Sequence, residues 1–146
     1  MNRLIAGDER PPPRPWSAHG LAVFLTAICL GALAWLASAK ASGFFEPYDS
    51  TIGILVNQAV LIAGAIGVGL GAGLRHSPGF VLIFLLGAYV GLNAYPYAFG
   101  SSESRAWAAL GAVASLILLV VPAVCSLALL AYRVVRERQE HTSRPR

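Results

Sequence analysis

Long apolar blocks, separated by short polar segments, dominate the pattern of the chain. Four blocks of about twenty residues contain no Asp, Glu, Lys, Arg or His, and they cover 20–39, 51–74, 79–97 and 106–132. At ~1.5 Å per residue, a helix of about 20 apolar residues crosses a hydrocarbon layer of ~30 Å. The pattern therefore predicts four membrane-spanning segments.

The blocks are apolar on every side, which distinguishes them from the strands of a membrane barrel. Such strands alternate apolar and polar residues over about 10 positions. Backbone groups in lipid must be hydrogen-bonded within the segment, and a helix achieves this. We therefore predict an all-α membrane protein, a four-helix bundle with an antiparallel up-down order. The short segment "RHSPG" between the second and third spans predicts that these two helices pack as a hairpin.

The polar ends divide the chain into three parts. A proline-rich leader at 1–19 precedes the transmembrane domain at 20–132, and a basic tail occupies 133–146. The leader contains "DERPPPRPW", whose four prolines exclude a helix. The run Ala37-Ser38-Ala39 resembles a signal-peptide cleavage site, but a signal core holds only about 7 to 15 apolar residues. We therefore expect the first span to be retained.

Composition excludes a soluble globular domain. Hydrophobic residues make up 56% of the chain and charged residues 12%, which is about half the charged share of a soluble protein. Ten of the eleven basic residues are Arg. With abundant Ala, Gly and Pro, this usage is typical of GC-rich coding and favours a bacterial inner-membrane protein.

Basic residues are concentrated at the ends of the chain. Eight Arg lie in the two terminal segments, and Arg75 lies between the second and third spans. The two remaining loops carry only Lys40 and Arg105, beside three acidic residues. Because cytoplasmic loops are enriched in Lys and Arg, we expect both termini to lie in the cytoplasm.

The arginines nearest the inner boundary also predict a lipid contact. We expect them to form a collar for anionic lipid, composed of Arg14, Arg75, Arg133, Arg136 and Arg138. Anionic headgroups attract each such charge by about 1 kcal/mol. The sequence therefore favours a membrane surface over nucleic acid as the partner of these charges.

Glycine is concentrated in the second span. The segment "GAIGVGLGAG" and the third span together supply seven candidate helix-packing positions: Gly64, Gly67, Gly69, Gly71, Gly73, Gly87 and Gly91. In lipid the helix is enforced, so glycine's small size serves close approach between helices. We therefore expect the second helix to be central, with neighbours on two sides. The alternative, an unwound half-helix that binds an ion, needs a polar partner that 63–74 lacks.

Few polar side chains lie inside the spans. We expect an intramembrane polar cluster near the outer ends of the second and third spans, formed by Asn57, Gln58, Tyr89 and Asn93. Two interpretations stay open. The amides fix helix register by interhelical hydrogen bonds, or they line an outward-facing pocket under a rim of aromatic residues.

The proline, cysteine and histidine residues in and near the spans favour structural roles over catalytic or metal-binding ones. Pro122 lies inside the fourth span, where it frees the carbonyl of Leu118 and predicts a helix kink. Cys29 and Cys125 lie in spans and lack the C-x-x-C spacing of a redox site. The three histidines lie near arginines on the cytoplasmic side, and we predict neither a metal site nor a cofactor.

The absence of ionisable groups within the spans removes the relay that proton-coupled transport uses. No nucleophile, base or metal cluster near a span marks a catalytic site. We therefore expect a structural or accessory role, with the bilayer and a second copy or a larger membrane complex as partners. Two alternatives stay open: a small oligomeric channel or passive carrier for an uncharged solute, and a membrane enzyme that acts on a lipid or quinone.

Overall fold

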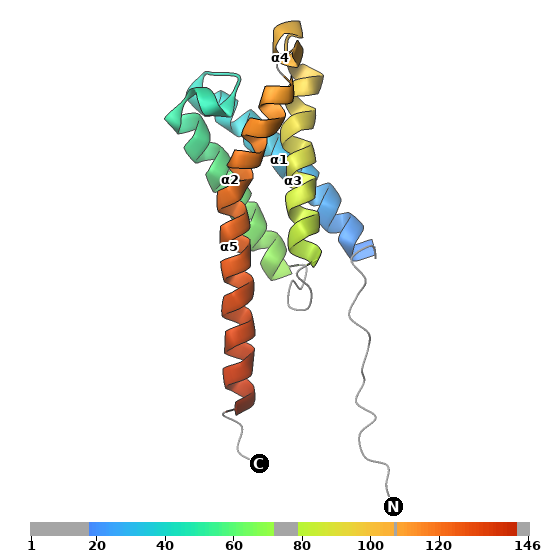
Figure 1. The fold of residues 1–146 in the computed structure, drawn as a ribbon, viewed down its shortest axis with the longest axis vertical. Helices are drawn as coiled ribbons and strands as arrows, with labels where there is room; N and C mark the ends of the chain where they lie inside the picture. Colours follow the sequence, from blue (N-terminus) through green and yellow to red (C-terminus); the bar gives the residue numbers. More distant parts are fainter. Residues whose placement is uncertain (1–17, 72–78, 107, 143–146) are drawn as a thin grey trace, which may run out of the picture.

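The computed structural model describes residues 18–71, 79–106 and 108–142, and these are helical apart from short connections. The four long helices are α1 (Ala18–Ser42), α2 (Thr51–Gly71), α3 (Gly79–Phe99) and α5 (Ala108–Thr142) (Figure 1). Two short helices, η1 (Pro47–Asp49) and α4 (Ser102–Ala106), lie in the connections. The described residues contain no strand, which confirms the prediction of an all-helical chain.

Each predicted span falls on one of the long helices. All four are long and apolar enough to cross a membrane, which confirms this part of the prediction. α3 has 21 residues and is therefore about 31 Å long at ~1.5 Å per residue. α5 has 35 residues and continues past Tyr132 to Thr142, so much of the basic tail is helical. Residues 72–74 of the second predicted span lie outside the described residues.

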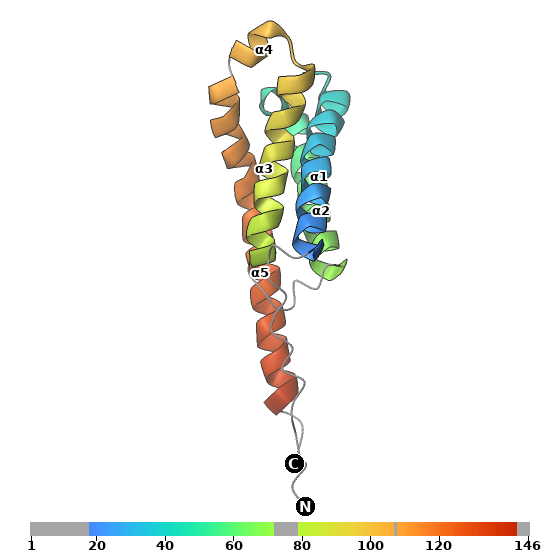
Figure 2. The ribbon, with the colours of Figure 1, turned by 90° about the vertical axis from the view of Figure 1, so that its right-hand side faces the viewer.

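The four long helices form a ring in which neighbours follow the order α1, α2, α5, α3. α1 makes its most extensive contact with α3 and also packs on α2, while α5 packs against both α2 and α3. Figure 1 shows α1 passing obliquely behind α3 with α5 in front, and Figure 2 shows α1 beside α3. α5 extends beyond the other helices at the end where α1 begins (Figure 1).

α2 and α3 contact each other little, although they follow one another in the chain. The expected packing of these two helices as a hairpin is therefore corrected. A short connection brings two helix ends together, but the faces that pack depend on the side chains along the whole helix. α1 lies against both of them and takes the place that the hairpin interface would have had.

α3 is more enclosed than α2. In their most apolar windows, 44% of the α3 residues are buried, against 28% for α2. Side chains from α1 and α3 dominate two core clusters. The first contains Val23, Ala27, Ala65, Phe80, Val81, Ile83 and Phe84, and the second contains Ala34, Trp35, Leu61, Ala88, Leu92 and Leu119. This corrects the expectation that the glycine-rich second helix is the central one.

The connection between α1 and α2 is folded back onto α2. Gly43 follows the end of α1, and its φ of 76° lies in the left-handed region that glycine adopts without strain. The backbone of Pro47 packs so closely on α2 that a Cβ at Gly53 would lie 2.6 Å from the Pro47 carbonyl oxygen. Ser50 caps α2 because its Oγ accepts a 3.2 Å hydrogen bond from the Ile52 N–H. This connection places Glu46 and Tyr48 at one end of the bundle.

Candidate functional site

The amide of Gln58 reaches from α2 to the backbone of α5. Its Nε2 donates a 2.7 Å hydrogen bond to the carbonyl oxygen of Leu118. Residue 122 would normally donate its N–H to that carbonyl, but Pro122 has no N–H. Gln58 therefore supplies the hydrogen bond that Pro122 removes.

This pairing predicts that the effects of Gln58 and Pro122 on stability are coupled. We expect Gln58→Leu to lower the free energy of unfolding by roughly 1–2 kcal/mol, because it leaves the Leu118 carbonyl unpaired in an apolar interior. In a Pro122→Ala background the helix donates its own N–H to Leu118, so Gln58→Leu is expected to cost much less. A double-mutant cycle by reversible unfolding in detergent measures the difference. Equal costs in both backgrounds would contradict the coupling.

Asn93 contacts α5 from the opposite side of the bundle. Its Nδ2 donates a 2.8 Å hydrogen bond to the Tyr89 carbonyl one turn earlier in α3. Its Oδ1 accepts a 3.4 Å hydrogen bond from the hydroxyl of Ser115, a residue fully buried on α5. Tyr89 and Asn93 thus form one polar group with Ser115, which the sequence analysis did not include.

Asn57 is fully buried, and neither polar atom of its side chain has a hydrogen-bond partner among the described residues. Oε1 of the neighbouring Gln58 and the indole Nε1 of Trp35 are also buried without a partner there. Gln58 and Asn93 hydrogen-bond to α5 at different residues, Leu118 and Ser115. Gln58 binds α5, Tyr89 and Asn93 lie on α3 toward Ser115, and the Asn57 amide lies apart from these hydrogen bonds.

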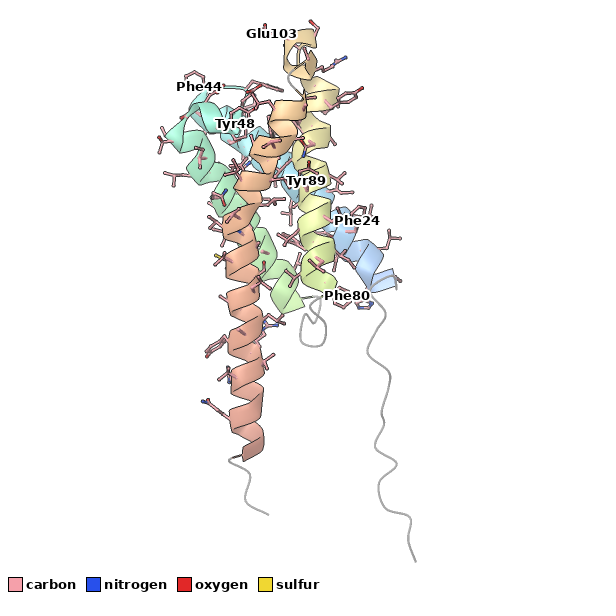
Figure 3. The ribbon with its side chains drawn as sticks, in the orientation of Figure 1. Phe24, Phe44, Tyr48, Phe80, Tyr89 and Glu103 are labelled. Carbon is pink, nitrogen blue, oxygen red and sulfur yellow. The ribbon has the colours of Figure 1, made fainter. Side chains whose placement is uncertain are left out.

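A pocket of about 450 Å³ lies at the end of the bundle that carries η1 and α4. Its aromatic lining comes from Trp35, Tyr48, Tyr89 and Tyr97. Figure 3 labels Tyr48, a residue of η1, and Tyr89 on α3, both in the half of the bundle nearer α4. The volume falls within the range of roughly 300–1,000 Å³ that is common for small-molecule sites.

Polar groups of three kinds face the same pocket. Glu46 contributes a carboxylate, Arg105 a guanidinium and Asn93 an amide. Arg105 also donates a 3.3 Å hydrogen bond from Nη2 to the carbonyl of Gly100, which holds it near the end of α3. Sequence reasoning placed Glu46 and Arg105 in separate outer loops and did not bring them together.

Tyr48 connects three elements around this pocket. Its ring meets Trp35 of α1 edge to face, with ring centres 6.3 Å apart. Its hydroxyl oxygen lies 3.8 Å from where a Cβ of Gly111 on α5 would stand. Tyr48 therefore forms a wall of the pocket between the start of α5 and the end of α1.

The closest approach of two helices occurs where α1 crosses α3. A Cβ atom on Gly91 would clash with the carbonyl oxygen of Ile28. A Cβ atom on Gly87 would lie 2.6 Å from the carbonyl oxygen of Phe24. Backbone therefore meets backbone at this crossing, a proximity that only small residues permit.

α1 contributes a third glycine to the crossing. A Cβ atom on Gly31 would clash with the carbonyl oxygen of Ala88 and lie 2.9 Å from the Leu92 nitrogen. Gly31 is not among the packing residues that the sequence predicts. The spacing of Ala27 and Gly31, two small residues four positions apart, is the signal that would have found it.

The glycines of α2 have more open surroundings. A Cβ atom on Gly64 would lie 2.7 Å from Cδ1 of Leu30, the flexible end of a side chain. Gly67 is exposed, and a Cβ atom there would meet nothing within 4 Å. The expected packing role of Gly67 is therefore corrected for contacts within the described part of one chain. Its face of α2 is available to lipid or to another molecule.

Arg133 reaches from α5 to the end of α2. Its Nη1 donates a 2.9 Å hydrogen bond to the carbonyl oxygen of Gly69, and α2 ends at Gly71. The last four carbonyls of a helix lack an intrahelical donor and carry the negative end of the helix dipole. Arg133 therefore caps α2 as well as lying in the expected lipid collar.

Of the other residues expected in the lipid collar or in helix packing, some lie on α5 and some lie outside the described part of the chain. Arg136 is exposed on α5, and Arg138 lies on the same helix. Arg14, Arg75 and Gly73 lie outside the described residues.

Within the described residues, no three His, Cys, Asp or Glu side chains are grouped to hold a metal ion. Comparison of the chain with protein families, curated proteins and solved structures finds no match.

Proposed function

We propose that this chain is a small multi-pass membrane protein with a structural or accessory role, which assembles through the outer face of α2. This face is defined by three exposed small residues at four-residue spacing, Ala59, Ala63 and Gly67. Nothing in the described chain lies within 4 Å of a Cβ atom at Gly67. In lipid, such a small-residue stripe permits another helix to approach closely. A second copy of this chain, or a helix of a larger membrane complex, fits that surface.

The contrast with the other exposed faces supports this assignment. α1, α3 and α5 present bulky apolar side chains, such as Leu25, Leu82 and Ile117, each more than half exposed. Bulky aliphatic side chains suit contact with lipid chains, which are as apolar as leucine. On α2, Ile52 and Leu55 are also more than half exposed, and the small residues that follow them form a stripe that matches the pattern of helix-association motifs.

Gly67→Leu is expected to weaken self-association of the purified protein roughly tenfold or more, because a leucine side chain separates the two helix backbones. Sedimentation in a mild detergent measures the oligomer population against protein concentration. Ala128→Leu is the matched control, since Ala128 is also exposed but lies on α5. An unchanged association constant in Gly67→Leu would count against the outer face of α2 as the interface.

The membrane orientation belongs to the same proposal. We place the chain in a bacterial inner membrane as an antiparallel up-down bundle, with both termini and the anionic-lipid collar in the cytoplasm. The distribution of arginine supports this placement. Figure 1, in which α1 begins and α5 ends on the same side of the bundle, agrees with an even number of crossings.

Reporter fusions test the orientation directly. A phosphatase or fluorescent reporter fused after Arg146 is expected to report the cytoplasm, and one inserted at Ser102 the opposite compartment. Arginine side chains resist transfer across the bilayer, which is the physical reason for the fixed orientation. The same compartment at both positions would rule out four crossings.

The two alternative functions have different structural support. A channel or carrier for an uncharged solute needs a polar path, and Asn57 and Gln58 are not among the residues that line the 450 Å³ pocket. An enzyme acting on lipid or quinone would use that pocket with Glu46 or Arg105 as reacting groups. Assembly through α2 accounts for a feature that both alternatives leave unexplained, the exposed stripe of small residues.

A further inference from the structure

The pocket near η1 and α4 presents one negative and one positive side chain to the same space. Glu46 precedes η1, and Arg105 lies on α4. Arg105 is exposed and Glu46 is partly buried, so a ligand with a single charge would gain one charge contact and leave the other side chain to solvent. A ligand that carries one positive and one negative group satisfies both side chains.

The part of the pocket around Glu46 is suited to a cation. Tyr48 and Glu46 both line this part of the pocket, and the Tyr48 ring packs edge to face on the buried Trp35. The aromatic ring of Tyr48, which is partly exposed, attracts ammonium groups through its quadrupole. A carboxylate next to this ring adds a direct charge contact. Primary and quaternary ammonium groups are therefore the cations that this wall would bind.

The guanidinium of Arg105 is suited to an anion. Its fork of N–H donors matches the oxygens of phosphate and carboxylate groups. One of its nitrogens is held by the Gly100 carbonyl at 3.3 Å, and the others remain able to donate. The anion site thus lies on α4, and the cation site lies between η1 and α1.

We infer that the pocket binds a zwitterion in which an ammonium group and a phosphate or carboxylate are joined by a short linker. The ammonium lies against Tyr48 and Glu46, and the anion lies against Arg105. Apolar lining from Val90, Ala94 and Ala112 accommodates the carbon chain next to these groups. Both the headgroup of a zwitterionic phospholipid and a free soluble zwitterion have this chemistry.

Calorimetry with the full chain in a maltoside detergent separates these sources. The probes are phosphocholine, monomeric dihexanoylphosphatidylcholine, choline and inorganic phosphate. Phosphocholine is expected to bind about tenfold more tightly than choline or phosphate, each of which loses one charge-assisted contact. A lipid that binds more tightly than phosphocholine assigns the site to a headgroup, and equal affinity of these two assigns it to a soluble zwitterion. Equal binding of all four probes, or binding of none, overturns the inference.

Two conservative variants locate the two charges. Glu46→Gln is expected to weaken phosphocholine and choline about tenfold while leaving phosphate unchanged, and Arg105→Gln is expected to weaken phosphocholine and phosphate while leaving choline unchanged. Glu103→Gln is the control, because Glu103 is an exposed acid on α4 outside the pocket lining. Circular dichroism checks that each variant keeps its helices. If phosphocholine binds folded Glu46→Gln and folded Arg105→Gln with unchanged affinity, the inference is overturned. The comparison of the four probes on the unmodified chain tests the inference independently of these variants.

Discussion

Gly91→Ala is expected to destabilise the bundle by roughly 1–3 kcal/mol, because overpacking of a close contact forces the backbone to shift. The added Cβ would clash with the carbonyl oxygen of Ile28 and lie 3.0 Å from the nitrogen of Ala32. Both atoms belong to the α1 backbone, so no side-chain rotation relieves the contact. Thermal unfolding in detergent, followed by circular dichroism, measures the effect.

Gly67→Ala provides the control for this prediction. The same methyl group is added to a helix, but at a position where nothing lies within 4 Å. We expect a change within about 0.5 kcal/mol, as is usual for surface positions. If Gly91→Ala and Gly67→Ala had the same unfolding temperature as the unmodified protein, close packing of α1 on α3 would be refuted.

Asn57→Leu is expected to stabilise the protein by roughly 1–3 kcal/mol. The Asn57 amide is fully buried without a partner among the described residues, and an unsatisfied buried polar group costs about that much. Leucine has the same branched arrangement of heavy atoms, so it replaces the amide without a large change of shape. Reversible unfolding in detergent measures the change in the free energy of unfolding.

The neighbouring position gives the opposite sign. Gln58→Leu is expected to destabilise, because Gln58 donates to the Leu118 carbonyl. The two substitutions remove adjacent amides from the same helix, and they differ in whether a hydrogen bond is lost. Destabilisation by both would mean that Asn57 has a partner beyond the described chain and would contradict its assignment as an unsatisfied group.

The four long helices could be predicted from the sequence because the physical signal is local. A block without charged residues has the length of a hydrocarbon layer, and the loss of water forces its backbone into a helix. Ser50 at the start of α2 is a similar case, since its side chain caps the adjacent backbone. Such features depend on residues within one turn of each other, which the order of the chain shows directly.

The choice of helix neighbours could not be predicted in the same way. The short connection between α2 and α3 suggested that they pack together, whereas α1 lies against both. Small residues decide which helix surfaces approach closely, and Gly67 and Gly91 have the same G-x-x-x-G context in the sequence. Only the arrangement of α1 shows that Gly91 is a contact and Gly67 is exposed.

The polar groups show the same division between local and distant information. Pro122 predicts that the Leu118 carbonyl lacks its helical partner, since proline has no N–H. That Gln58 is the donor depends on how α2 lies against α5, and those residues are 60 positions apart. The pocket residues Glu46 and Arg105 come from different loops and meet only because η1 and α4 lie at the same end of the bundle.

Cysteine cross-linking in the membrane directly tests self-assembly of this chain through the outer face of α2. The native Cys29 and Cys125 are free and are first replaced by serine. Ala63→Cys on α2 is then compared with Val124→Cys, an exposed position on α5. Under mild oxidation, the account predicts a disulfide-linked dimer for Ala63→Cys and monomer for Val124→Cys. Monomer for Ala63→Cys, or equal dimer yields at both positions, would contradict it.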